Sequence, residues 1–163
     1  MNLQIEPATT RDLGDLLQWR TEVLHAVFSI PIDTPLDALR EANRRYYETE
    51  LPRGGHLACF ARLDGVRAGC GGVCFYPEMP SPDNPTGRCA YLMNIYTKPA
   101  FRGQGVGRAV VGWLVNEAKR RGISKIYLET SDAGRALYRA LGFVDMPDML
   151  KLPQAKTPGG TQP

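Results

Sequence analysis

The stretch NIYTKPAFRGQGVG, residues 94–107, decides the fold because it passes from strand to turn to helix. Residues 88–97 are rich in aromatic and branched apolar side chains, which is typical of a β-strand. Pro99 interrupts that pattern, and from Gly103 apolar residues return every three or four positions on one helical face. The sequence therefore predicts a strand, a tight turn and a helix that ends at Gly122.

Three glycines, Gly103, Gly105 and Gly107, lie at the turn and the helix start. Glycine lets the backbone turn tightly and approach a ligand, and a helix start presents unpaired N–H groups that favour a phosphate or pyrophosphate. Glycines before a helix also occur for packing alone, so the spacing by itself leaves both interpretations open. Two familiar motifs are excluded: GxGxxG needs glycine where Arg108 stands, and the lysine and hydroxyl of a P-loop are missing.

Outward from this stretch, hydrophobic periodicity and turn residues predict further strands and helices. The Asp64-Gly65 pair between two β-type runs predicts a tight hairpin. An opening strand breaks at Pro7, and the next helix, capped by Thr10, has Arg20 among the leucines of its buried stripe. The predicted strands are 3–6, 56–63, 66–76, 88–97, 123–130 and 144–152; the predicted helices are 11–30, 35–51, 103–121 and 133–141, with an exposed loop at 77–87.

This order of elements predicts an α/β fold with a mixed central β-sheet of about six to seven strands flanked by about four helices. A chain of 163 residues fits one domain of ordinary size, so residues 1–152 are expected to form a single domain. The tail 153–163 is polar and rich in proline and glycine, and we expect it to be disordered.

Composition excludes several classes of protein. The net charge of +3 is small, and the one basic cluster, residues 119–121, fits a helix end, so no nucleic-acid partner is expected. No signal peptide precedes the first strand and no run approaches ~20 apolar residues, which predicts a cytoplasmic protein with no membrane partner. The cysteines lack CxxC spacing and are expected to be reduced core thiols, with no metal site: Cys59, Cys70, Cys74 and Cys89.

Two motifs resemble the GNAT acyltransferases. Arg102-x-x-Gly105-x-Gly107, after a strand and a proline turn, is similar to the acyl-CoA signature of that family. About thirty residues on, the segment ALYRALGF, residues 136–143, resembles the family's LYxxLGF element. The resemblance covers residues 56–152 well, and the N-terminal third only through its strand-helix-helix order.

The resemblance implies a GNAT fold and acetyl-CoA as cosubstrate, with no metal. In that family the loop amides hold the CoA pyrophosphate and the preceding strand pairs with the pantetheine arm. Backbone N–H groups near Ile95 and Tyr96 are also the natural oxyanion donors, because fixed amides cost little reorganisation. The implied cofactor-binding residues are Ile95, Tyr96, Thr97, Arg102, Gly103, Gln104, Gly105, Val106, Gly107 and Arg108.

The resemblance also implies that Tyr138 is catalytic and lies near the thioester sulfur. The CoA thiolate that leaves should titrate near ~8.5 and a tyrosine near ~10, so the phenol can lend it a proton or a hydrogen bond. The alternative is an amphipathic core tyrosine with a satisfied hydroxyl. Ser131, Asp132 and Ala133 stand where the family often has an asparagine, so the chain departs from the family pattern there.

No single residue stands out as the base that deprotonates the acceptor amine. Glu78, Glu129, Asp132 and His25 are candidates, and water could relay the proton. Cys89 lies near the active strand, but direct transfer needs no acyl-enzyme, which favours a core role for this thiol.

The function expected from the resemblance is N-acetyl transfer from acetyl-CoA to a primary amine, directly in a ternary complex. A small-molecule amine is the first choice of acceptor. The alternatives are a protein N-terminus or lysine, because the fold does not set the acceptor, or a non-catalytic acyl-CoA-binding module. A homodimer is a further possibility, because GNAT proteins often associate.

Overall fold

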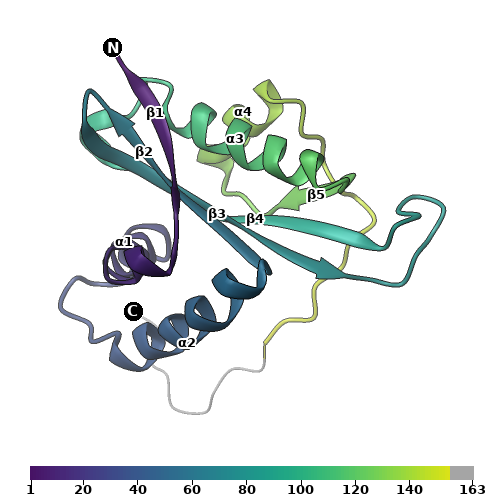
Figure 1. Ribbon diagram of the computed structural model, residues 1–163, viewed down its shortest axis with the longest axis horizontal. Coiled ribbons are helices and arrows are strands. Elements are labelled where there is room, and N and C mark those ends of the chain that lie inside the picture. The colour runs from purple at the N-terminus through teal and green to yellow at the C-terminus, as the bar shows by residue number, and fades with distance from the viewer. Residues whose placement is uncertain (155–163) are drawn as a thin grey trace.

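The computed structural model describes residues 1–154 and has one five-stranded sheet between two layers of helices (Figure 1). The strand order is β1-β2-β3-β4-β5; the first three pairings are antiparallel and the β4–β5 pairing is parallel. Helices α1 and α2 cover one face, and α3 and α4 lie on the other. The elements are β1 (Leu3–Ala8), η1 (Thr10–Asp12), α1 (Leu13–Val27), α2 (Asp37–Arg53), β2 (His56–Leu63), β3 (Val66–Pro77), β4 (Arg88–Thr97), η2 (Pro99–Phe101), α3 (Val106–Arg120), β5 (Lys125–Leu128) and α4 (Asp132–Ala140).

Each face of the sheet has its own apolar core. Along β2 the side chains alternate, so that Cys59 and Ala61 pack toward α3 while Ala58 and Phe60 pack toward α1 and α2. Because both faces are covered, β2 is almost continuously buried rather than alternately exposed. The α/β class and the mixed sheet predicted from the sequence are confirmed.

The local turn chemistry matches the prediction at the hairpin and differs at the first helix. Asp64 and Gly65 both have positive φ, +48° and +85°, as the tight turn requires. Pro7 does not end β1, which tolerates a proline because it is an edge strand. Thr9, not Thr10, caps the first turn: its side chain accepts from the Arg11 N–H, and Asp12 accepts from the Thr9 N–H at 2.9 Å.

The predicted strand 144–152 is wrong, and the sheet has five strands instead of six to seven. Residues 144–152 belong to no strand, and the chain turns at Pro147 and Asp148. Proline has no N–H to donate to a ladder, and the side chains of Val144 and Leu152 are 85% and 91% exposed, so nothing buries this segment. Of the tail predicted to be disordered, residues 155–163 lie outside the described residues.

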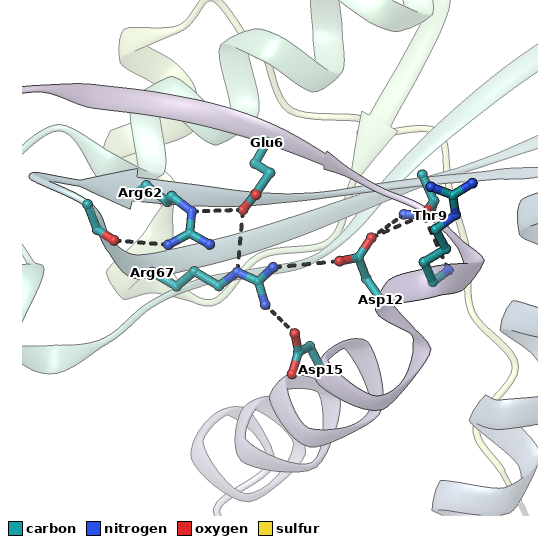
Figure 2. Close-up of polar contacts among 8 residues, drawn as sticks. Glu6, Thr9, Asp12, Asp15, Arg62 and Arg67 are labelled. Atoms are coloured by element: carbon teal, nitrogen blue, oxygen red, sulfur yellow. Dashed lines mark hydrogen bonds and ion pairs between the residues drawn. The ribbon is translucent and has the colours of Figure 1, made fainter.

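An arginine network fixes α1 against the first three strands (Figure 2). The Arg67 guanidinium of β3 forms ion pairs with Glu6 of β1, Asp12 of η1 and Asp15 of α1, and it stacks 4.1 Å from the centroid of the Phe60 ring. Arg62 of β2 shares Glu6, with 3.0 Å between Nε and Oε2. Three carboxylates therefore neutralise one half-buried cation and join four elements.

Candidate active site

The site begins where β4 separates from β5. Their parallel pairing ends at Leu92 and Leu128, so within the described residues the β5 side of residues 93–97 has no strand partner. The β3–β4 register also shifts here, and Asn94 has φ +58°, which a residue other than glycine rarely adopts. This β-bulge and open edge leave backbone N–H and C=O groups free to pair with an extended ligand. The predicted residues Ile95, Tyr96 and Thr97 all lie on this stretch.

The loop after β4 is shaped by backbone geometry rather than by packing at two of its three glycines. Gly103 and Gly105 have φ of +75° and +82°, and a Cβ added to either would meet nothing within 4 Å. Gly105 is the N-cap of α3, while the Val106 side chain is buried and anchors the helix start in the core. Packing is therefore not the reason for Gly103 and Gly105, whose positive φ the turn itself requires.

Gly107 is different because its missing side chain lets α4 approach. A Cβ at Gly107 would lie 3.2 Å from Leu137 Cδ2. Gly134 lies on α4 itself: a Cβ there would lie 2.5 Å from Oγ1 of Thr130, just before the helix, and 3.4 Å from Tyr138 Cε2, one turn further along it. Close packing of α4 against the start of α3 thus brings Leu137, the residue before Tyr138, against Gly107 at the end of the glycine loop, residues 102–107.

The electrostatic environment of the loop suits an anion. The first turn of α3 contains no acidic residue, and its N–H groups carry the positive end of the helix dipole. Arg102 and Arg108 are exposed beside it, and within residues 1–154 neither forms an ion pair. Arg102 Nε donates to the Thr97 carbonyl at 3.3 Å and Gln104 Nε2 to the Ala100 carbonyl at 3.2 Å, which holds the loop against the strand end.

Tyr138 is half-buried on α4, with its ring edge-on to Phe143 at a centroid distance of 5.9 Å. Burial raises the pKa of the phenol, so the hydroxyl is protonated at neutral pH. Its hydroxyl forms no hydrogen bond to another described residue, which leaves it able to donate to a ligand. This differs from the alternative of a core tyrosine with a satisfied hydroxyl.

A polar cluster on the α1–α2 face was not predicted as part of the site. Arg20 of α1 donates from Nη1 to Asn94 Oδ1 at 3.0 Å and from Nε to Asn43 Oδ1 of α2 at 3.3 Å. The only sequence signal was an arginine within the leucine stripe of a helix. We call the following residues the Arg20 cluster: Arg20, Asn43, Tyr46, His56, Cys74 and Asn94.

Inside the Arg20 cluster, Tyr46 joins α2 to the sheet. Its hydroxyl lies 3.0 Å from His56 Nδ1 and 2.8 Å from Cys74 Sγ. His56 is buried, and its Nε2 has no hydrogen-bond partner among the described residues. Burial, aided by the charge of Arg20, lowers the pKa of His56 to about 4, so the imidazole is neutral at pH 7.

The four candidate bases have different surroundings. Glu78 binds Asn84 and Lys125, whose hydrogen bonds lower the pKa of its carboxyl to about 2, so it holds the β3–β4 loop. Asp132 projects fully into solvent, and His25 Nδ1 contacts the Ile30 carbonyl at 3.1 Å. Glu129 directly follows Leu128, the last residue of β5 paired with β4, so it stands at the opening between these strands.

Two other predictions concern the cysteines and the loop 77–87. Cys59, Cys70 and Cys89 are buried free thiols as expected, while Cys74 is half-buried in the Arg20 cluster. Burial raises the pKa of Cys89, which fits a core role.

The loop 77–87 is not exposed throughout, because Asn84 is 1% exposed and donates from Nδ2 to Glu78 and to the Arg88 carbonyl.

Among residues 1–154, no group of three or more His, Cys, Asp or Glu side chains is arranged to hold a metal ion. In the same part of the chain, no helix has the length and apolar character needed to cross a membrane.

Comparison with known proteins identifies the family. Residues 21–143 match the model of the Acetyltransferase (GNAT) family. The chain therefore belongs to the GNAT acetyltransferases, as the two motifs indicated. A predicted acetyltransferase from Clostridium acetobutylicum, solved with acetyl-CoA, superposes with a TM-score of 0.81 at 30% identity, over 93% of this chain and 96% of that one.

Two curated relatives match over shorter regions. The [ribosomal protein bS18]-alanine N-acetyltransferase of Escherichia coli K12 is 40% identical over 102 residues, which cover 61% of this chain and 55% of that protein. The thialysine N-ε-acetyltransferase of Bos taurus is 38% identical over 63 residues, 37% of each chain. The chain thus matches about half, or less, of the length of these relatives.

Proposed function

We propose that this protein is an acetyl-CoA-dependent N-acetyltransferase that transfers the acetyl group directly to a primary amine, and that residues 1–152 form its single domain. The observation that carries the proposal is the open edge of β4 at residues 93–97, followed at once by the glycine loop at the start of α3. An extended thiol arm fits the first feature, and a pyrophosphate fits the second.

The cofactor contacts follow from this placement. The N–H groups of residues 104–108 bind the pyrophosphate, with the side chains of Arg102 and Arg108 adding positive charge. The backbone of Ile95 and Thr97 pairs with the pantetheine arm. The thioester then lies at the bulge beside Asn94, where the N–H groups of Ile95 and Tyr96 face the carbonyl oxygen as charge develops on it.

The chemistry needs one new bond and two proton transfers. The amine nitrogen attacks the thioester carbon, the C–N bond forms, and the C–S bond breaks to release the CoA thiolate. Tyr138 donates a hydrogen bond or its proton to that sulfur, and Glu129, directly or through water, takes the proton that the amine loses. Among the four candidate bases, Glu129 is favoured by its position at the opening between β4 and β5.

The acceptor is proposed to be a small-molecule amine. The relatives named above act on different amines: one on a ribosomal protein alanine and one on thialysine. A protein N-terminus is therefore the second candidate, and it is favoured by the higher identity of the bacterial relative, 40%.

The test is acetyl transfer by the purified protein across a panel of small amines and short peptides. Release of free CoA thiol and the mass of the product are followed together. The expected result is thiol release that depends on one class of amine, with a product that carries one acetyl group. Acetyl-CoA binding without thiol release for any acceptor would contradict catalysis and favour a non-catalytic binding module.

A further inference from the structure

The Arg20 guanidinium has only neutral partners, although it is partly buried. Its Nε and one Nη1 hydrogen are used by the amide oxygens of Asn43 and Asn94, which leaves three of its five N–H groups without a partner in residues 1–154. No carboxylate of the described residues lies within ion-pair distance of it. Arg67, by contrast, is surrounded by Glu6, Asp12 and Asp15.

The carboxylates that act on this region already have cations of their own. Glu50 raises the pKa of Tyr46 and Cys74, but its Oε2 lies 2.6 Å from Arg53 Nε. Glu22 is 3.6 Å from Lys98 Nζ. The Arg20 cluster therefore keeps an uncompensated positive charge.

A second cation with a neutral partner lies close by. Arg40 of α2 reaches Thr21, the next residue after Arg20, with 3.5 Å between Nη1 and Oγ1. Arg40 likewise forms no ion pair within the described part of the chain. The positive charge of Arg20 also acts on other groups of this region. It helps to lower the pKa of His56, and it opposes the increase in the pKa of Tyr47 that burial causes.

The position of Arg20 links this charge to the proposed reaction centre. Its Asn94 contact is the bulge residue of β4, which has φ +58° and lies beside the proposed position of the thioester. A guanidinium with a free N–H fork matches one planar carboxylate. An acceptor held there would have its anionic group and its reacting amine a few bonds apart.

We propose that Arg20 binds the carboxylate of the acceptor, so that the substrate is a free amino acid or a similar small amine that carries a carboxylate. This inference rests on the proposed acetyl transfer. It separates the two acceptor classes considered above, because a protein N-terminus has a peptide amide where a free amino acid has its carboxylate. It also disfavours polycationic amines, which the unpaired charges of Arg20 and Arg40 would repel.

The test compares matched acceptors in the wild type and in variants. Each free amino acid is paired with its primary amide and with the amine that lacks the carboxyl group, and kcat/KM is measured from thiol release; 2-aminoethyl phosphate is included as a phosphate probe. In the wild type the carboxylate should be preferred by about 10- to 100-fold over its amide. Arg20→Gln should bring that ratio close to one, and Arg20→Lys should keep part of it.

The controls separate binding of the carboxylate from folding and from cofactor binding. Arg45→Gln removes the same charge from the outer surface of α2, where Arg45 is 69% exposed, and should leave the ratio unchanged. Acetyl-CoA affinity and melting temperature should stay near wild type in Arg20→Gln. If Arg20→Gln does not fold, the wild-type ratio and that of Arg20→Lys still decide the question.

Four results would overturn the carboxylate assignment: equal use of carboxylate and amide, a preference that survives in Arg20→Gln, a preference for the phosphate probe, or no turnover of any free amino acid. If acetyl-CoA still binds in that last case, the cofactor assignment stands and only the substrate class fails. Absence of acetyl-CoA binding to the wild type would instead overturn the proposed function itself.

Discussion

The glycine loop beside α3 and the Arg20 cluster under α1 and α2 meet at one strand, β4, but they are built differently. The loop offers backbone N–H groups, and its residues are consecutive, with positive φ at Gly103 and Gly105. The Arg20 cluster offers side chains that come from α1, α2 and three strands. Under the proposed function, the loop binds acetyl-CoA, which is the same whatever the acceptor. The side chains of the Arg20 cluster, by contrast, can be substituted to suit a different acceptor.

The largest effect is expected from breaking the loop alone. Gly105→Glu forces a side chain into φ +82° and places a negative charge where the pyrophosphate should bind. Acetyl-CoA affinity measured by calorimetric titration should fall by more than about 100-fold. Gly122→Glu is the matched control: Gly122 also has positive φ and open space, but it lies at the other end of α3 and should keep affinity within a few-fold.

The second prediction concerns stability on the Arg20 side. His56 takes up a proton less readily in the folded protein, where its pKa is about 4, than in the unfolded chain, where it is near 6.5. The unfolded state therefore binds more protons below pH 6.5, and stability falls as the pH drops from 6.5 toward 4. The loss over that window should reach about 3 kcal/mol.

Denaturant unfolding at pH values from 7 to 5 measures this slope. His56→Gln removes the titrating group while keeping a polar side chain, so its stability should depend less on pH in the same window. If the free energy of unfolding fell equally with pH in the wild type and in His56→Gln, groups other than His56 would be responsible for the loss of stability in acid.

Third, Tyr138→Phe separates chemistry from cofactor binding. Loss of the phenolic hydroxyl should lower kcat by about 100-fold, because the thiolate then leaves without a proton donor. Acetyl-CoA affinity should change little. Tyr76→Phe, on β3 at the far end from the loop, should keep kcat near wild type; a kcat for Tyr138→Phe equal to wild type would return Tyr138 to a packing role.

The smallest effect sharpens the contrast between Arg67 and Arg20. Arg67→Met leaves Asp12 and Asp15 close together without their cation and should lower the free energy of unfolding by about 1–2 kcal/mol. High salt should reduce that loss, and the carboxylate preference of the enzyme should be retained. A change in acceptor preference instead of stability would show that Arg67 contributes to recognition.

The parts of the molecule that the sequence predicts are those that depend on local backbone needs. The Asp64-Gly65 hairpin and the glycine loop require positive φ, and consecutive residues reveal this requirement. The strand 144–152 failed for a related reason: apolar content suggested a strand, but Pro147 and the lack of a covering element outweighed it. The prediction of Thr10 as the helix cap was wrong because only Thr9, the residue before it, is placed to form the capping box with Asp12.

The Arg20 cluster could not be assembled from the sequence. Arg20 and Asn94 are 74 residues apart, and their contact depends on how α1 crosses the sheet. Asn94 is the first residue of the stretch 94–107, but nothing in the neighbouring sequence marks it as the bulge residue with positive φ. Side chains that meet only through tertiary packing leave no spacing pattern to recognise.

A crystal structure of the protein with acetyl-CoA tests the central claim most directly. The account predicts the pyrophosphate on the N–H groups of residues 104–108, the arm along residues 95–97, and the thioester at the Asn94 bulge with Tyr138 facing the sulfur. Acetyl-CoA bound elsewhere would contradict it, for example at the hollow of about 220 Å³ beside Phe75, Arg88 and Ile123, where β4 begins.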